Sequence, residues 1–157
     1  MLSLLLRNLF FTILQPGIVA GLIPYWLVRG SIHHAFEKPL YSWQFLSILV
    51  FIFGVYLMLD CIFRFAIKGR GTLSPADPTK KLVISGWYRY SRNPMYVGVM
   101  MILLGESMFF KSTSLWIYSF MVMTAFTLFT MFVEEPRLRR DFGEEYADYC
   151  KKVRRWL

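Results

Sequence analysis

Cysteine and histidine are scarce in this chain, which has two of each among its 157 residues. A disulfide-stabilised secreted fold and a Cys/His metal centre both need more of these residues, at regular spacing. Cys61 falls inside an apolar run and Cys150 near the C-terminus, while the pair His33-His34 stands alone in a connecting loop. The sequence therefore predicts neither a disulfide framework nor a metal site.

Acidic residues are also few, with 10 against 18 basic ones and a net charge of +8. The basic residues lie beside the ends of apolar runs, a placement typical of proteins that meet anionic lipid headgroups rather than nucleic acid. The chain has no internal repeat or low-complexity tract, and no small-residue cleavage pattern follows its first apolar run. We therefore expect one domain over residues 1–157, no cleaved signal peptide and no nucleic-acid partner.

Hydrophobic residues, by contrast, make up 56% of the chain, and its mean hydropathy is +0.44. Four runs are long and uncharged enough to predict membrane spans, at about 9–28, 43–67, 95–110 and 115–133. The first contains two prolines and two glycines, so it predicts either one kinked span or a broken hairpin. The fold class expected is an all-α integral membrane protein with about four transmembrane helices.

The positions of the basic residues predict the topology. With four spans, all but three of the 18 basic residues fall on one side of the membrane, the exceptions being Arg29, Lys38 and Lys111. The positive-inside rule then places both termini in the cytoplasm, for a bacterial protein at the inner membrane.

The residues after Pro136 predict an amphipathic helix. Their apolar members recur at steps of three and four; they are Leu138, Phe142, Tyr146, Tyr149, Val153 and Trp156. We expect this C-terminal cytoplasmic helix either to lie on the membrane surface or to fold back over the ends of the spans. Gly143 interrupts the pattern and is a candidate for the start of the helix.

Arg92-Asn93-Pro94 opens the third apolar run and predicts a helix N-terminus. Asn93 is a favourable N-cap, and Pro94 suits the first helical position because its missing N–H costs nothing there. The free N–H groups and positive end of such a helix, with Arg92 beside them, can hold an anion. Capping with an interfacial arginine is the simpler interpretation, and both stay open.

Glu134-Glu135 closes the fourth apolar run, where two carboxylates would stand at a helix C-terminus that is already negative. Neutralisation by Arg137, Arg139 and Arg140 is one explanation, and a cationic or polyhydroxyl ligand is the other. If spans three and four are neighbours joined by a tight turn, this pair faces the Arg92 segment.

Two further groups of charged residues lie inside the apolar runs. Asp60 and Arg64 are spaced for an intrahelical ion pair. Glu106, inside the third span, has either a substrate-related or a structural role.

These motifs, taken in order, resemble the isoprenylcysteine carboxyl methyltransferases and the phospholipid methyltransferases around them, including their compact bacterial members. The matching residues are Gly86-x-Tyr88, Arg92-Asn93-Pro94-x-Tyr96-x-Gly98, Glu134-Glu135-x-x-Leu138, Phe142-Gly143-x-x-Tyr146-x-x-Tyr149 and Arg155-Trp156. The resemblance covers about residues 82–157. Asn93 stands where the family more often has His, so an acid/base role of that His is absent, and Arg154 stands where Pro is frequent.

The resemblance implies a membrane enzyme that uses S-adenosylmethionine, releasing S-adenosylhomocysteine, with a lipophilic acceptor arriving from the bilayer. Its cofactor pocket would be formed by Gly86, Trp87, Tyr88, Arg92, Asn93, Pro94, Tyr96, Gly98, Glu134, Glu135 and Tyr146. In this scheme the cofactor carboxylate meets Arg92, its ammonium and ribose meet the glutamates, and its adenine stacks on Trp87, Tyr88 or Tyr146. Arg92 and Glu135 are the expected catalytic positions.

Three acceptor classes stay open: a prenylcysteine-type carboxylate, a lipid amine, and a small hydrophobic oxygen or sulfur nucleophile. A reductase using NADPH, like the membrane sterol reductases, is an alternative function, although those enzymes are larger. A non-enzymatic membrane protein whose basic tail binds anionic lipid is the other.

Overall fold

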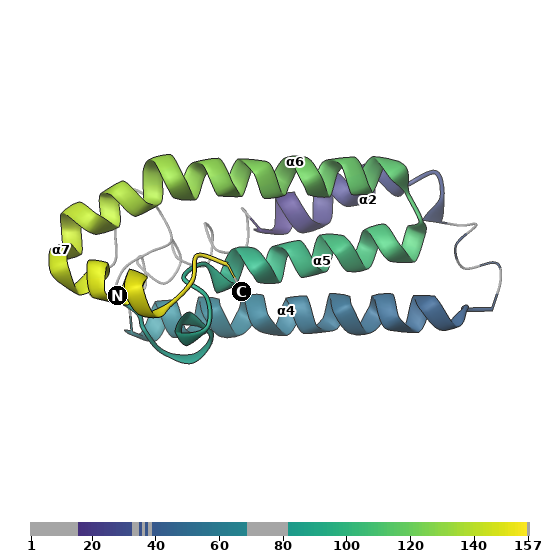
Figure 1. Ribbon diagram of the computed structural model, residues 1–157. Coiled ribbons are helices and arrows are strands. Elements are labelled where there is room, and N and C mark those ends of the chain that lie inside the picture. Colours follow the sequence, from purple (N-terminus) through teal and green to yellow (C-terminus); the bar gives the residue numbers. More distant parts are fainter. Residues whose placement is uncertain (1–15, 33–34, 36, 38, 69–81, 157) are drawn as a thin grey trace, which may run out of the picture.

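Every regular element among the described residues is helical. The computed structural model describes residues 16–32, 35, 37, 39–68 and 82–156. Its elements are η1 (Ile18–Leu22), α2 (Ile23–Val28), α4 (Ser42–Lys68), η2 (Gly86–Arg89), α5 (Pro94–Phe110), α6 (Thr113–Phe129), η3 (Thr130–Glu134) and α7 (Glu135–Lys152). Helices α4, α5 and α6 lie side by side along one axis, with α2 beside α6 and α7 at one end (Figure 1). We call that end the α7 end, and the end with the α5–α6 turn the far end.

Two of the four expected spans are long and apolar enough to cross a membrane: Ser42–Arg64, and the apolar part of the continuous helix Thr113–Lys152. The other two helices, Ile18–Val28 and Pro94–Phe110, are apolar but shorter. At 1.5 Å per residue, the 17 residues of α5 reach about 26 Å, against a hydrocarbon core of about 30 Å. Residues 9–15 of the first run lie outside the described residues, so the choice between kinked span and hairpin stays open.

Glycines let α4 and α5 approach closely. A Cβ added at Gly98 would lie 2.8 Å from the backbone nitrogen of Met58, and one at Gly54 would lie 2.8 Å from the carbonyl oxygen of Gly98. Gly105, seven residues after Gly98, meets the α4 backbone in the same way, 2.9 Å from the Ser47 carbonyl oxygen. Small residues on one face permit this backbone contact, which supplies packing energy where the hydrophobic effect between helices is weak.

Side-chain hydroxyls join α5, α6 and η1. The Ser107 and Ser119 hydroxyls are 3.1 Å apart across α5 and α6, and the Tyr118 hydroxyl donates to the carbonyl of Val19 at 2.8 Å. The outer faces of α4 and α6 remain covered with exposed large hydrophobic side chains, such as Phe120 at 75% exposure. This distribution, with polar links inside and apolar groups outside, is that of a helix bundle in lipid.

Both π-helical segments precede a proline near the start of the next helix. Pro24 follows η1 and Pro136 follows η3. Proline has no N–H and its ring clashes with the carbonyl four residues earlier, and a one-residue π insertion relieves both problems. The helix therefore continues through Pro136. The expectation that Glu134-Glu135 ends a helix is wrong: both residues lie inside one continuous helical run.

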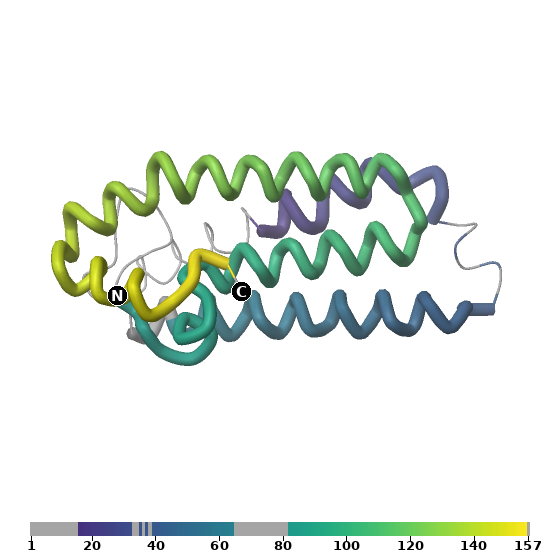
Figure 2. The backbone as a smooth tube through the Cα atoms, viewed as in Figure 1, coloured from purple at the N-terminus to yellow at the C-terminus, as the bar shows by residue number. Residues whose placement is uncertain are grey.

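Helix α7 folds back over the neighbouring ends of α4 and α5, which is one of the two arrangements expected from the sequence (Figure 2). It begins at Glu135, so Gly143 is not its start; Gly143 instead breaks it, with φ 50° and ψ −121°. Its apolar stripe forms a buried cluster of Tyr146, Tyr149 and Val153 that packs on Leu82. The predicted stripe is thus confirmed.

Candidate functional site at the α7 end

The two clusters singled out in the sequence meet at the α7 end. Arg92 Nη1 lies 3.1 Å from Glu135 Oε1. Arg155, from the C-terminal tail, holds the same carboxylate with both of its arms, Nε to Oε1 at 2.7 Å and Nη2 to Oε2 at 3.0 Å. The Glu135 side chain is only 9% exposed and that of Arg92 12%. The bundle therefore encloses one carboxylate between two guanidinium groups.

The neutralisation of the glutamate pair includes two of the three arginines considered in the sequence: the charge of Arg137 acts on Glu134 and that of Arg139 on Glu135, in addition to the direct partners Arg92 and Arg155. Arg137 and Arg140 each lie 3.5 Å from Asp141, on the surface side of α7. Burial by itself raises the pKa of Glu135, but the Arg155 hydrogen bond and the charges of Arg92 and Arg155 outweigh it and hold the pKa below the ordinary value. Glu135 is therefore ionised at neutral pH.

The C-terminal tail is tied across the start of α5. The backbone N–H of Arg92 donates to the Arg154 carbonyl at 2.9 Å. The Arg155 carbonyl accepts from Ser91 Oγ at 3.2 Å and from Asn93 Nδ2 at 3.1 Å. Asn93 occupies the N-cap position and Pro94 the first turn, as expected, but the Asn93 side chain makes no capping hydrogen bond. Asn93 binds the tail in place of capping the helix.

Glu134 is the last residue of η3, and its carboxylate faces α5. The hydroxyls of Tyr96 and Thr130 face its carboxylate, and the Tyr96 ring stacks on Phe126 at 4.4 Å between centroids. Even so, Glu134 Oε2 and Thr130 Oγ1 are buried without a well-aligned hydrogen bond within the described part of the chain, and so is Arg92 Nε. Buried polar atoms are normally satisfied, so three unsatisfied ones at one site need an explanation.

The remaining predicted site residues mostly have structural partners. Gly86 has φ +65°, and a Cβ there would clash with the Arg64 side chain, which itself pairs with Asp60 at 2.6 Å as predicted. The Trp87 ring packs edge-on against Phe53 at 5.8 Å. Gly98 belongs to the α4–α5 contact rather than to the α7 end.

Two tyrosines of the predicted pocket lie where η2 and α7 meet: Tyr88 belongs to η2 and Tyr146 to α7. The backbone carbonyl of Tyr88 accepts a hydrogen bond from the Tyr149 hydroxyl, and burial raises the pKa of Tyr88 well above its ordinary value. Tyr146 is 2% exposed, with its hydroxyl 3.5 Å from Arg92 Nη1. The Tyr146 ring is therefore enclosed in this arrangement, whereas Tyr88 remains partly exposed.

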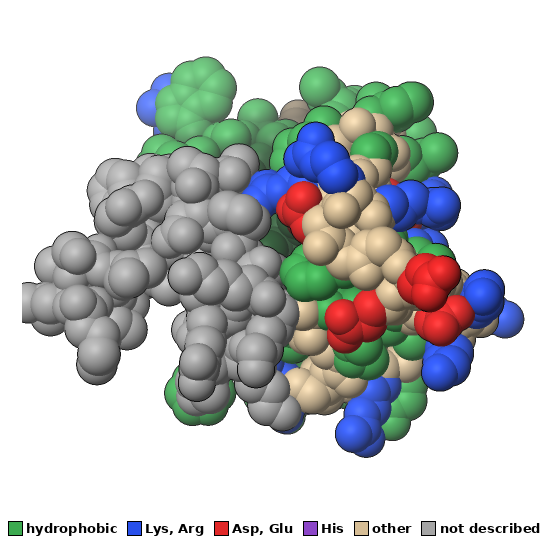
Figure 3. All heavy atoms as spheres, turned by 90° about the vertical axis from the view of Figure 1, so that its left-hand side faces the viewer, with side chains coloured by type: hydrophobic (Ala, Val, Ile, Leu, Met, Phe, Trp, Pro, Cys, Tyr) green, Lys and Arg blue, Asp and Glu red, His purple; other side chains and the backbone are tan. Residues whose placement is uncertain are grey.

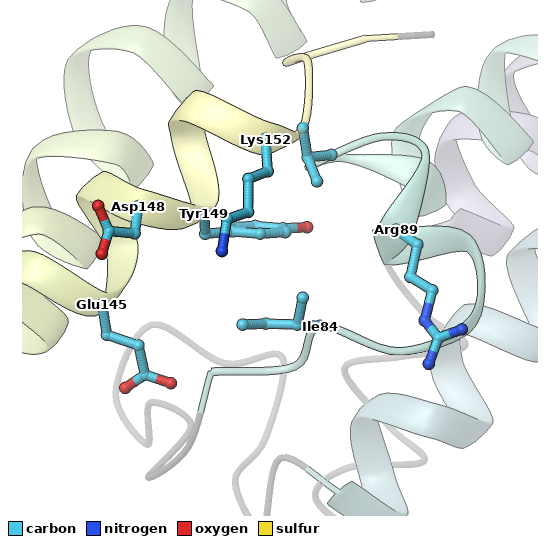
Figure 4. A pocket seen from close by; sticks show the side chains of 7 residues that line it. Ile84, Arg89, Glu145, Asp148, Tyr149 and Lys152 are labelled. Carbon is cyan, nitrogen blue, oxygen red and sulfur yellow. The ribbon is translucent and has the colours of Figure 1, made fainter.

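A hollow of about 410 Å³ opens beside Tyr149. It lies between η2 and α7, with Arg89 on one side and Glu145 and Asp148 on the other (Figure 4). The Lys152 side chain lies next to the Tyr149 ring, and Ile84 lies below both in this view. The surface at this end carries basic and acidic side chains close together (Figure 3). The volume falls in the range of pockets for small molecules, about 300–1,000 Å³.

Sequence reasoning missed three groups of the site. Arg155 was noted as part of the terminal motif but not as a partner of Glu135. Cys150 lies with its sulfur 2.8 Å from Arg92 Nη1. Thr130 precedes Glu134 by four residues, and this helical spacing is the one signal that could have placed it beside the carboxylate. Glu106 lies toward the far end of α5 and takes no part in this cluster.

Fold and site together define an all-helical, membrane-associated protein with a charged, partly unsatisfied site at one end of its bundle. The phospholipid methyltransferase family matches residues 42–145, about two thirds of the chain. The chain belongs to this family, and it is therefore a methyltransferase in general class. A protein of Haemophilus influenzae described as an uncharacterized protein is 33% identical over 63 residues, which are 40% of this chain and the whole of that protein. No solved structure matches the chain significantly.

Proposed function

We propose that the protein transfers a methyl group from S-adenosylmethionine to a lipophilic acceptor, at the α7 end and on the cytoplasmic side of the membrane. One observation carries the proposal: within the described residues, Arg92 Nε, Glu134 Oε2 and Thr130 Oγ1 are buried without a well-aligned hydrogen bond, and Arg92 and Glu134 belong to the two motifs that meet at the α7 end. Members of the family generally use this cofactor.

The unsatisfied atoms fit the charges of the cofactor. Arg92 Nε is a cationic donor suited to a carboxylate, while Glu134 Oε2 and Thr130 Oγ1 are acceptors suited to an ammonium group or ribose hydroxyls. The cofactor, when bound, supplies a methyl group already activated on a sulfonium. Arg92, Glu134 and Thr130 would hold it, and the adjoining hollow beside Tyr149 offers volume for its remaining part.

The other residues of the cluster position these groups and exclude water. Glu135, paired with Arg155, fixes the Arg92 guanidinium on one side, so that its Nε faces away from that carboxylate. The tail bonded to Ser91 and Asn93 closes the site from the solvent. Methyl transfer needs alignment of two reactants more than covalent help, so orientation and water exclusion are the contributions expected from the chain.

The acceptor proposed is lipophilic because the apolar outer faces of α4 and α6 suit a protein in a bilayer, where its substrates are lipid-soluble. A prenylcysteine-type carboxylate, a lipid amine and a small hydrophobic oxygen or sulfur nucleophile all meet this condition. The family match disfavours the reductase using NADPH, since the matched family is one of methyltransferases.

Titration calorimetry of the full chain in a neutral maltoside tests cofactor binding. S-adenosylmethionine and S-adenosylhomocysteine should bind saturably, and NADPH should not. Glu134→Gln, which removes a charge but leaves the Arg92–Glu135–Arg155 cluster in place, should weaken binding by about 10- to 100-fold, the loss of a charge-assisted hydrogen bond. A lipid extract incubated with methyl-labelled cofactor then identifies the acceptor.

The matched control is Glu144→Gln, which removes the same charge from an exposed position of α7 and should bind the cofactor like the unaltered protein. Absence of binding by a folded sample would overturn the proposal. Equal affinities in the Glu134 and Glu144 variants would show that the cofactor lies elsewhere.

A further inference from the structure

A second carboxylate without a partner lies at the far end of the bundle. Glu106 is one turn from the end of α5, and its Oε2 is buried without a hydrogen bond in the described residues. About 12 residues of helix separate it from Pro94, or roughly 18 Å along the axis. This site is therefore separate from the one at the α7 end.

Nothing in the described part of the chain neutralises Glu106. The nearby Tyr118 hydroxyl is already committed to the carbonyl of Val19 at 2.8 Å. Two basic residues of this end that the structure describes contact aromatic rings, Lys111 over Trp43 at 4.2 Å and Arg29 over Trp26 at 5.2 Å. A carboxylate in a membrane segment is costly unless something pairs with it, and such residues usually mark a functional site.

Glu106 lines a cavity of about 190 Å³. The other walls are apolar or aromatic: Pro24, Tyr25 and Val28 from α2, Phe110 from α5 and Leu115 from α6. Protein interiors contain few voids larger than a water molecule. A proton on Glu106 would remove the charge but would leave the carboxyl group without a polar partner among these apolar walls, so a cationic group is the better match.

We propose that this cavity binds the ammonium group of an amphiphilic amine. The carboxylate supplies the opposite charge, and the rings of Tyr25 and Phe110 supply the aromatic surface that favours organic cations over small hydrated ions. Tyr25, which lines the cavity, is 59% exposed, so the cavity reaches the outer surface of the bundle beside α2. The hydrocarbon chain of the ligand would lie against that face.

Binding of octyltrimethylammonium to the full chain in a neutral maltoside tests this site. Calorimetry should show saturable binding that Glu106→Gln weakens about tenfold or more, as for loss of a desolvated ion pair. Glu106→Asp, which keeps the charge, should retain most of the affinity and shows that the site still folds. Glu144→Gln is the control for a lost charge elsewhere.

Two further probes separate the possible sources of the cation. Octanol should bind weakly and equally to both Glu106 variants, and tetramethylammonium should bind more weakly than its octyl derivative. Equal affinity of octyltrimethylammonium for the Gln variant and the unaltered protein, or tight binding of octanol, would overturn the site. Tetramethylammonium binding as tightly as the octyl compound would overturn its assignment to an amphiphile. S-adenosylhomocysteine titrations of the same variants report the α7 end independently.

Discussion

The two ends of the bundle treat a buried carboxylate in opposite ways. At the α7 end, Glu135 is held by Arg92 and Arg155 at 2.7–3.1 Å. At the far end, Glu106 lines an apolar cavity and has no counter-charge in the described residues. The Glu135 carboxylate thus stabilises the fold through two ion pairs, while Glu106 has no such pair in the described residues. Replacing each carboxylate should therefore affect stability in opposite directions.

The largest expected effect comes from Glu135→Ala. Removal of this carboxylate leaves two guanidinium groups close together in a mostly buried site, and breaking such a cluster costs about 3–5 kcal/mol. Thermal unfolding in detergent should show a marked fall in the midpoint. Asp141→Ala, which removes a carboxylate from a more exposed pair, is the matched control, and an equal fall there would contradict a special role of the cluster.

Glu106→Leu should raise the free energy of unfolding, whereas Glu135→Ala lowers it. The substitution replaces an unpaired carboxylate by an apolar side chain that partly fills the cavity, and we expect a gain of about 1–3 kcal/mol. The same unfolding measurement checks it. A loss of stability would mean that Glu106 already has a partner, and the contrast between the two ends would disappear.

The smallest effect is expected for Asn93→Ala. Its side chain contributes one hydrogen bond to the Arg155 carbonyl, so its loss should cost about 0.5–1.5 kcal/mol. Because the bond ties down the tail, proteolysis of the C-terminus should become faster in the variant, while octyltrimethylammonium binding at Glu106 stays unchanged. Altered binding there would show that the two ends are coupled.

Much of the helical pattern could be predicted from the apolar runs and the helix signals around them. Pro94 opens α5 where the sequence indicates, and α4 covers the predicted run at 43–67 with one residue more at each end. The amphipathic stripe of α7 was readable because its period is helical. The sequence did not show whether the helix continues through Pro136, since a proline after two glutamates either ends a helix or bends it, depending on whether a π turn can form.

The pairing of Arg92 with Glu135 could be anticipated because adjacent helices joined by a short turn bring their ends together. The pairing of Arg155 with Glu135 could not be anticipated, since the two residues are 20 positions apart and the break at Gly143 lies between them. Asn93 illustrates the same limit: its type and position favour a cap, but a carbonyl from a distant segment competes for its amide.

The sequence by itself determined the helices, the apolar surface and the family, because these depend on composition, local spacing and ordered motifs. The tertiary structure decided which charges meet and which do not. Arg155 reaches Glu135 because α7 turns back over the bundle. Glu106 has no partner among the described residues because α2, α5 and α6 surround it with apolar groups. A charge's partner depends on distances of a few ångströms in three dimensions, which no local pattern in the sequence contains.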